Sequence, residues 1–318
     1  MTSTSGGAVP AAVEPAGVSA TKPVSVLRAG DTSKPDPFTI CIVANPAIER
    51  SLGSGRFIPD PIISNPTAFL VSAQYIHDAL FGTLPGQREK LLADPSVVGK
   101  VRVISLFVSG LIAEDRYSLV GEDPYSTLLM PRRSVFDTFL AGFSLRADVA
   151  YAVSASQSHT GASAYYTTDD DSRPGVAFIL DGVARTHRYY CQVPGTVAIH
   201  HTSRGLTALH EFSHALSSYT NGMVVDLYVD FGTGLNKKAA RPIPGDFAVY
   251  NGTTFKSDMI RDGLSYPPGW SSFHCEPHLP VSPVVMDNYW AATMPDHCEH
   301  DKITRQFLLD RVRAKTIR

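Results

Sequence analysis

One segment restricts the architecture of this chain more than any other: residues 209–215 read Leu-His-Glu-Phe-Ser-His-Ala within a stretch of helical periodicity. Two histidines four residues apart project from the same face of a helix, one turn above the other. One tetrahedral zinc ion accepts two imidazoles at that spacing, and a glutamate between them can reach a metal-activated water as general base. The segment therefore predicts a zinc-binding helix with His210 and His214 as ligands and Glu211 as the catalytic base.

The boundaries of this helix are predicted from its neighbours in the sequence. We expect it to run from about residue 204 to about residue 219, with Thr202 or Ser203 as N-cap and Asn221-Gly222 as the C-terminal stop. The chain has only eight glutamates, so a chance glutamate between two such histidines is rare. The apolar positions expected to pack away from the histidines are Ala208, Leu209, Phe212 and Leu216.

A catalytic zinc ion normally has a third protein ligand and one position left for water. Because the helix should end at Asn221-Gly222, the chain can turn back beneath the metal, and Asp226 is the first ionisable side chain that it then offers. Asp226 is therefore the expected third ligand. Asp230 is the competing ligand, and a histidine of the 200–201 pair is a more distant alternative.

A second segment of interest, residues 284–290, reads Val-Val-Met-Asp-Asn-Tyr-Trp in an irregular region after the zinc helix. The position of Met286 suggests a tight turn, with the Met286 side chain under the imidazoles that are expected to bind zinc. Tyr289, close to that turn, is the first candidate to stabilise the oxyanion that develops during hydrolysis. Tyr228 and Tyr219 are the alternatives for this role.

The rest of the chain has the pattern of a mixed sheet with helices. Residues 1–36 are rich in Ala, Gly, Ser, Thr and Pro, which predicts a flexible leader. Early strands that alternate with helices, followed by a meander of strands, indicate a mixed α/β (α+β) fold. The expected strands are 38–44, 100–108, 148–153, 162–167, 176–180, 187–192 and 196–200, and the other expected helices are 67–81, 134–143 and 301–315.

Cysteine and histidine gather again near the end of the chain, in His274-Cys-Glu-Pro-His278 and His297-Cys-Glu-His300. Sulfur and imidazole at these spacings can form a structural Cys₂His₂ zinc site. Alternatively, Cys275 and Cys298 can form a disulfide that closes the loop containing Met286. The residues alone leave both possibilities open.

Three smaller features have simpler interpretations. Cys41 and Cys191 fall in expected strands and should be buried thiols. The acidic run at residues 169–171 could bind Ca²⁺, although such a turn is more often solvated. Phe136, Phe139 and Phe143 follow a helical pattern and should belong to the core.

HEFSHA closed by Asn-Gly, the following Asp-Leu-Tyr and the later Val-Met-Asp-Asn-Tyr resemble a metzincin-type zinc metallopeptidase, and the chain is most similar to the IgA-peptidase-like family. The resemblance extends over about residues 38–312. It implies a zincin-like mixed sheet with backing helices in residues 37–222. It also implies a small irregular subdomain, with a Met-turn and a final helix, in residues 223–318, and it favours the Cys275–Cys298 disulfide.

The chain departs from the metzincin pattern at the third ligand. That ligand usually lies six residues after the second histidine and follows a glycine at the third, whereas Thr220 and Ser217 occupy those positions here. The loop that brings in the third ligand must therefore be longer. Asp226, chosen because it is the first ionisable side chain after the helix stop, therefore lies further from His214 than the third ligand of that pattern does.

Composition excludes several classes of partner. The chain has 28 Lys plus Arg against 30 Asp plus Glu, which argues against binding nucleic acid or an anionic membrane surface. No apolar run approaches the roughly 18 residues of a membrane-spanning helix. The N-terminal residues do not have the pattern of a standard secretory signal, although the family resemblance favours a secreted protein over a cytoplasmic one. We expect a monomer that acts on a protein or peptide.

The predicted function is that of a zinc-dependent endopeptidase, with one catalytic Zn²⁺ and Glu211 as general base. Two other classes stay open. The chain could be a binding module that uses zinc only for stability. It could also be a zinc amidohydrolase that cuts a non-peptide amide, because the motif determines the nucleophile and not the acyl group.

Overall fold

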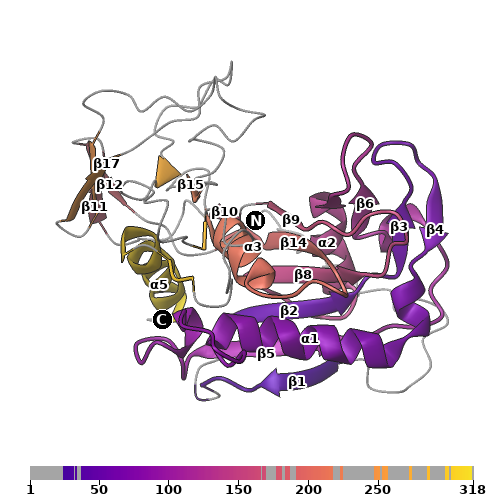
Figure 1. Cartoon of the computed structure of the whole chain (residues 1–318), viewed down its shortest axis with the longest axis horizontal. Coiled ribbons are helices and arrows are strands. Elements are labelled where there is room, and N and C mark those ends of the chain that lie inside the picture. Colours follow the sequence, from indigo (N-terminus) through magenta and orange to yellow (C-terminus); the bar gives the residue numbers. More distant parts are fainter. Residues whose placement is uncertain are drawn as a thin grey trace, which may run out of the picture.

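The computed structural model has an α+β architecture built around one large sheet (Figure 1). This sheet has six strands in the order β1-β5-β2-β8-β14-β9. The residues that the structure describes are 24–31, 33, 37–165, 167–169, 177–180, 183–186, 191–217, 223–224, 247–250, 253–256, 272–273, 285–286, 298–300 and 302–316. The strands of the large sheet are β1 (Val24–Arg28), β2 (Phe38–Ala44), β5 (Val101–Leu106), β8 (Val149–Ser154), β9 (Ser163–Tyr165) and β14 (Gly195–His200).

The four inner strands of this sheet are parallel, and both of their faces are covered. β5, β2, β8 and β14 run in the same direction, while β1 and β9 pair antiparallel at the two edges. Parallel strands covered on both faces are continuous apolar runs, and β2 is buried along its whole length. Since successive side chains point to opposite faces, Ile40 and Ile42 join one core while Cys41 and Val43 join the other.

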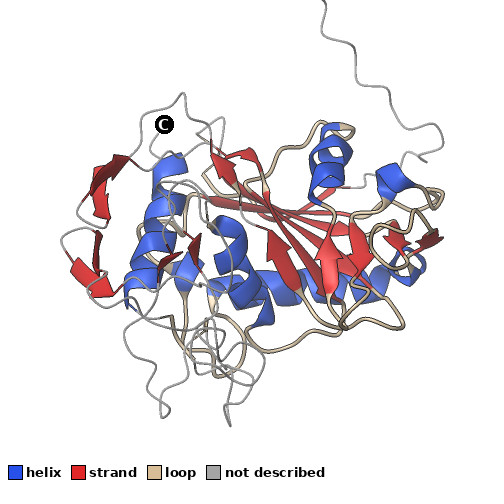
Figure 2. Ribbon diagram, turned by 90° about the horizontal axis from the view of Figure 1, so that it is seen from above, coloured by secondary structure: helices blue, strands red, loops and turns tan. Residues whose placement is uncertain are grey.

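Helices cover both faces of the large sheet (Figure 2). The core on one face includes residues of α1 (Pro66–Phe81), α3 (Thr207–Leu216) and α5 (Lys302–Thr316). α2 (Arg133–Ala141) packs on the other face. The ends of α1 are determined locally: the Asn65 side chain accepts a hydrogen bond from the Ala68 amide, and Gly82 ends the helix with a φ of 70°.

A second mixed sheet, in the order β4-β3-β6-β7, begins where β2 ends. A buried polar pair fixes this junction, because Asn45 Nδ2 donates to Asp60 Oδ2 (2.8 Å) and Asn45 Oδ1 accepts from the Leu119 amide (3.0 Å). Asp60 Oδ1 accepts from the amides of Ile62 and Ala155, and burial raises the pKa of this carboxyl above its usual value. The strands are β3 (Ala47–Glu49), β4 (Phe57–Pro59), β6 (Val120–Glu122) and β7 (Leu129–Pro131), and short 3₁₀ helices lie at Pro61–Ser64, Leu91–Ala93 and Asp115–Tyr117.

Shorter strands form three further sheets. β10 (Thr168–Asp169) pairs antiparallel with β13 (Cys191–Val193). β15 (Met223–Val224) pairs parallel with β18 (Ser272–Phe273), which joins two segments far apart in the sequence. A four-stranded antiparallel sheet consists, in order, of β12 (Val183–Thr186), β11 (Ala177–Leu180), β16 (Phe247–Tyr250) and β17 (Thr253–Lys256).

The predicted α+β class and most of the expected elements are confirmed. One difference concerns a strand. The predicted leader of residues 1–36 contains β1, and its pairing with the distant strand β5 has no local signal in the sequence. Of the strand expected at residues 187–192, residues 191–192 belong to β13, and residues 187–190 lie outside the described residues.

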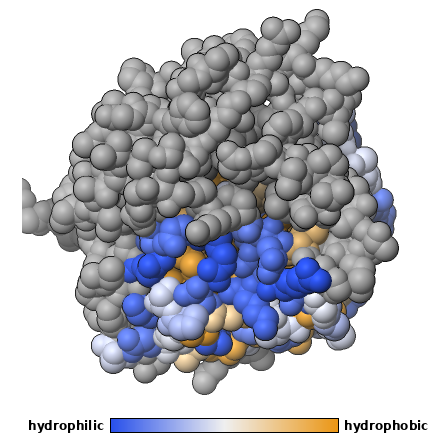
Figure 3. All heavy atoms as spheres, turned by 60° about the vertical axis from the view of Figure 1, so that its left-hand side comes forward, coloured by the Kyte–Doolittle hydropathy of each residue, from blue (hydrophilic) through white to orange (hydrophobic). Residues whose placement is uncertain are grey.

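The side of the molecule at the left of Figure 1 has a mainly hydrophilic described surface, with small apolar areas between polar ones (Figure 3). Among the residues described, no helix is both long enough and apolar enough to cross a membrane.

Candidate metal centre

The two histidines of the zinc motif converge on one point beside α3. His210 Nε2 and His214 Nε2 are 3.2 Å apart, and the ring planes are nearly perpendicular. Two nitrogens that each lie about 2.05 Å from one tetrahedral zinc ion are separated by about 3.3 Å. The two imidazoles therefore have the separation that a shared metal ion requires.

The opposite nitrogen of each ring donates to a backbone carbonyl. His210 Nδ1 lies 2.7 Å from the carbonyl oxygen of Val285, and His214 Nδ1 lies 2.8 Å from that of Val224. A carbonyl only accepts, so both Nδ1 atoms carry hydrogen, and a neutral ring then has a lone pair on Nε2. Two such lone pairs 3.2 Å apart repel each other unless a proton or a metal cation lies between them. This donor set fits a cation, and carbonyl partners of this kind orient metal-binding histidines.

Two buried tyrosines hold the start of α3 against the rest of the fold. Tyr151 on β8 donates to the carbonyl of Ala208 (2.8 Å), and Tyr75 on α1 donates to that of Gly205 (2.9 Å). Burial, together with the nearby Glu211 carboxylate, raises the pKa of the Tyr151 hydroxyl well above its usual value. Glu211 itself is largely buried on α3.

The end of α3 lies against the first residue of β14. A Cβ atom at Gly195 would overlap the carbonyl oxygen of Ala215, so only glycine allows the two backbones to approach this closely. The apolar positions of α3 belong to the core, as the sequence predicts; they are Ala208, Leu209, Phe212 and Leu216.

The predicted boundaries of the zinc helix are wrong at both ends. α3 begins at Thr207, and its N-cap is Leu206, without a side-chain cap. Thr202 instead lies 2.7 Å from His200 Nδ1, and the entry to the helix is set by long-range contacts such as the Tyr75 bond. At the other end the helix stops at Leu216, because Ser217 adopts an extended conformation. Asn221-Gly222 lies outside the described residues.

Met286 and Val285 form a turn that is fully buried. Met286 belongs to the same core cluster as α3, and the adjacent Val285 provides the carbonyl that orients His210. The Val285 amide in turn donates to the carbonyl of Glu299 (3.1 Å). The described turn at residues 285–286 therefore contacts α3 through a backbone acceptor.

Several predicted site residues lie outside the described part of the chain: Asp226, Asp230, Tyr219, Tyr228, Tyr289, Cys275 and, of the acidic run, Asp170 and Asp171. Cys298 is described and buried. The described residues, taken without those positions, contain no group of three or more His, Cys, Asp or Glu side chains arranged to hold a metal. The third ligand, the disulfide and the calcium site stay predictions.

His200 and Cys41 have clear roles within the described fold. Both ring nitrogens of His200 are engaged, Nδ1 by Thr202 and Nε2 by the carbonyl of Ser156 (3.1 Å), so this residue is not part of the pair formed by His210 and His214. Cys41 is a buried thiol, as predicted, and burial raises its pKa to about 12. Phe136 and Phe139 are core residues, and Phe143 packs against them.

A buried polar cluster behind α3 was not predicted. Ser213, between the two histidines of the motif, is 2.8 Å from His300 Nε2, and His300 Nδ1 is 3.1 Å from Glu89 Oε2. All three residues are buried. Glu89 and His300 are 211 residues apart in the sequence, so no local spacing pattern predicts their contact.

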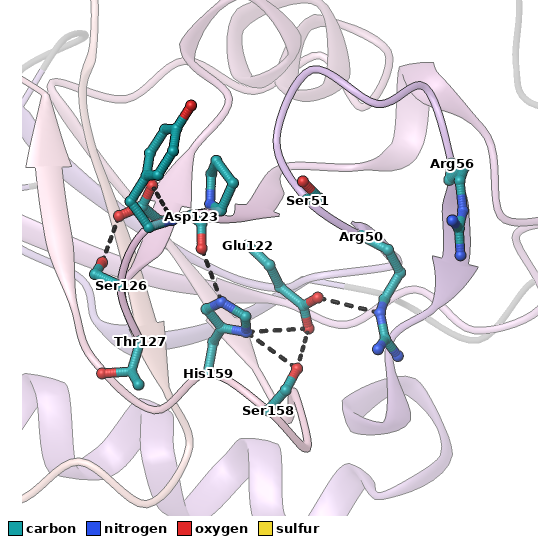
Figure 4. A pocket seen from close by; sticks show the side chains of 11 residues that line it. Arg50, Ser51, Arg56, Glu122, Asp123, Ser126, Thr127, Ser158 and His159 are labelled. Atoms are coloured by element: carbon teal, nitrogen blue, oxygen red, sulfur yellow. Dashed lines mark hydrogen bonds and ion pairs between the residues drawn. The ribbon is translucent and has the colours of Figure 1, made fainter.

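A polar pocket of about 670 Å³ lies elsewhere, among the loops around the second sheet (Figure 4). At its base the Glu122 carboxylate bonds to Arg50 Nε (3.2 Å) and to the hydroxyl groups of Ser156 (2.7 Å) and Ser158 (2.8 Å). His159 bonds through Nε2 to the carbonyl of Asp123 (3.0 Å). The pocket contains none of the residues of the zinc motif, and its buried charge is satisfied by the fold itself.

No protein-family model matches this chain, and no curated protein matches it in sequence. The geometry around α3 therefore carries the functional interpretation.

Proposed function

We propose that this chain is a zinc-dependent endopeptidase of the metzincin type, with His210, His214 and Asp226 as the metal ligands. One observation supports the proposal most strongly: the two Nε2 atoms of the motif lie 3.2 Å apart, with both Nδ1 atoms bound to carbonyls. The motif alone predicts that the two histidines lie on one face of a helix, but it does not predict the carbonyl partners of their Nδ1 atoms. The two carbonyls come from segments that follow the helix, and metal-binding histidines usually donate their second ring N–H to acceptors of this kind.

The large sheet supports the zincin-like part of the proposal. α1 and α3 pack on the same face of a mixed sheet whose last strand, β9, is antiparallel to its neighbour β14. β9 also lies next to α3 in the fold. A mixed sheet with backing helices is the arrangement that the family resemblance implies.

The proposed reaction is the hydrolysis of a peptide bond. When bound, a zinc ion supplies a Lewis acid that polarises the scissile carbonyl and lowers the pKa of a water molecule. Glu211 accepts a proton from the attacking water and passes it to the leaving amine. Tyr289 is the proposed donor to the developing oxyanion.

Substrate is proposed to bind as an added strand along β9. An edge strand offers backbone donors and acceptors, so an extended peptide gains affinity from main-chain hydrogen bonds and specificity from its alternate side chains. Tyr165, at the end of β9, is 38% exposed and is available for contact with such a peptide. The near-neutral charge of the chain agrees with recognition by shape and strand pairing.

The test compares wild type with Glu211→Gln and with Glu114→Gln, an exposed glutamate, as the matched control. Zinc content is measured on freshly purified protein, and cleavage of casein and of a peptide library is followed. We expect one zinc per chain in all three proteins and a loss of at least 100-fold in cleavage for Glu211→Gln alone. Cleavage at the wild-type rate by Glu211→Gln would remove this residue from the mechanism.

The same measurements separate the other classes. A zinc-stabilised binding module would hold zinc and cut none of the peptides. An amidohydrolase would also leave peptides intact, but would hydrolyse small non-peptide amides in a reaction that requires Glu211. Absence of zinc from the wild-type protein would contradict all three zinc-based functions.

A further inference from the structure

Glu89 accepts two hydrogen bonds from His300, in the segment that precedes α5. Its Oε2 atom accepts from the backbone amide of His300 (2.7 Å) and from His300 Nδ1 (3.1 Å). Its Oε1 atom is paired with Arg305 on α5 (3.3 Å). Glu89 is 2% exposed and the His300 side chain is fully buried, so the Glu89–His300 pair is shielded from water.

Two sets of hydrogen bonds connect the Glu89–His300 pair to the HExxH residues of α3. The first is direct, since His300 Nε2 bonds to Ser213 Oγ (2.8 Å), and Ser213 lies between the two proposed ligands on α3. The second runs through the backbone. The carbonyl of Glu299, next to His300, accepts from the Val285 amide (3.1 Å), and the Val285 carbonyl accepts from His210 Nδ1 (2.7 Å).

From these contacts we propose that Glu89 and His300 are positioning residues for the metal centre, which set the orientation of the His210 ring through Val285 and the placement of α3 through Ser213. The inference rests on the proposed function, because it assumes that His210 binds zinc. Neither residue is proposed to touch the metal or the substrate. Their proposed effect is to fix the position of the Val285 carbonyl, which binds Nδ1 of His210.

Metal binding by His210 depends on the direction in which its ring points. An imidazole ring can rotate about two side-chain bonds, and a fixed partner for Nδ1 helps to hold its Nε2 atom toward the metal. Val285 lies on a turn, so its carbonyl is fixed only if the turn is anchored. The described anchor of its amide is residue 299, which is the neighbour of the residue that Glu89 binds.

A purely structural role for Glu89 makes a different prediction from a positioning role. Loss of a buried carboxylate lowers stability in either case. Only a positioning role also weakens metal binding in the molecules that remain folded. Outer-shell partners of metal-binding histidines typically contribute 10- to 100-fold to metal affinity, and we expect an effect in this range.

Glu49 provides the matched control. Like Glu89 it is a buried carboxylate, and it is paired with an arginine, Arg132 (2.9 Å). It also accepts backbone amides, those of Gly53 (3.0 Å) and Gly55 (2.9 Å). It lies on β3 in the second sheet and has no described bond to the zinc helix or to residues 285–300.

The experiment uses the full chain as wild type, Glu89→Gln, His300→Gln and Glu49→Gln. Each apoprotein is titrated with Zn²⁺ in competition with a chelator to obtain the dissociation constant, and the visible spectrum of the Co²⁺ form reports the ligand geometry. We expect Glu89→Gln and His300→Gln to bind zinc 10- to 100-fold more weakly and to change the Co²⁺ spectrum. We expect Glu49→Gln to bind zinc as wild type does.

Equal zinc affinity in wild type and in folded Glu89→Gln would overturn the proposal, as would equal weakening in Glu49→Gln. If Glu89→Gln does not fold, Ser213→Ala tests the direct route, and there we expect about tenfold weaker binding. Unchanged binding in folded Ser213→Ala would then overturn the proposal. If wild type itself binds no zinc, the proposed function fails first, and that result is distinct from zinc binding that is indifferent to Glu89.

Discussion

The hydroxyl group of Tyr151 donates a hydrogen bond of 2.8 Å to the carbonyl of Ala208, and so joins the central strand β8 to the first turn of α3. Both residues are fully buried. Tyr151 also lies close enough to Glu211 for the carboxylate to affect its hydroxyl. The helix that carries the motif is therefore fastened to the middle of the sheet at the level of the proposed catalytic base.

Replacement of Tyr151 by phenylalanine should destabilise the chain by about 1 kcal/mol, the usual net value of one buried hydrogen bond. Urea unfolding followed by circular dichroism measures this change. Tyr125→Phe is the control, because Tyr125 is 94% exposed and its hydroxyl should contribute nothing. Equal stability of Tyr151→Phe and wild type would mean that this bond does not fasten the helix.

Glu89 should make the chain sensitive to acid. Its pKa is lowered from 4.5 to about 2: burial acts in the opposite direction, but the hydrogen bond and positive charge of His300 and the charge of Arg305 outweigh it. A carboxyl whose folded pKa lies below its unfolded pKa contributes stability above pH 4.5 and loses it as the pH falls toward 2. The contribution is of the order of 3 kcal/mol.

Unfolding free energies measured between pH 6 and pH 2 test this dependence. Glu89→Gln should show a flatter decline with acid than wild type, while Glu114→Gln, which changes an exposed carboxylate, should follow the wild-type curve. A Glu89→Gln curve parallel to that of wild type would exclude Glu89 as the source of the acid dependence.

Removal of zinc should lower the melting temperature. A ligand that binds only the folded state, present at 100 times its dissociation constant, stabilises it by about 2.7 kcal/mol. This corresponds to a shift of about 4 °C for a chain of 318 residues. A thermal melt with and without chelator should show the shift in wild type and in His159→Ala, and should show none in His210→Ala. A shift that persists in His210→Ala would place the metal elsewhere.

Gly195 should tolerate no side chain. Because a Cβ atom there would overlap the carbonyl oxygen of Ala215, Gly195→Ala must move either β14 or the end of α3. Overpacking of this kind costs about 1 to 3 kcal/mol. Gly99→Ala is the matched control, since a Cβ atom at Gly99 meets nothing within 4 Å. Chemical denaturation of both variants should show a large loss for Gly195→Ala and little or none for Gly99→Ala.

The elements that local sequence determines were predicted well. α1 lies between Asn65 and Gly82, whose side-chain cap and positive φ are local properties, and its predicted bounds differ from the observed ones by one residue. β2 is a short β-branched run followed by Asn45-Pro46, and its predicted bounds agree with the structure. In both cases the stop signals are adjacent to the element they end.

Features that depend on distant partners were missed. The start of α3 is set by Tyr75, 130 residues away from its acceptor, and not by a capping hydroxyl near the helix. The strand β1 pairs with β5, which lies more than 70 residues further along the chain, and the Glu89–His300 contact joins residues 211 positions apart. Composition and periodicity describe a residue by its neighbours, so they carry no information about such pairs.

The carbonyl that orients His210 lies 75 residues further along the chain, at Val285. During synthesis the helix with its motif therefore leaves the ribosome well before the residue that aims its first histidine. Until residue 285 has been synthesised, His210 lacks the carbonyl that binds its Nδ1 atom. If the chain is a peptidase, its complete metal centre can therefore form only late in translation.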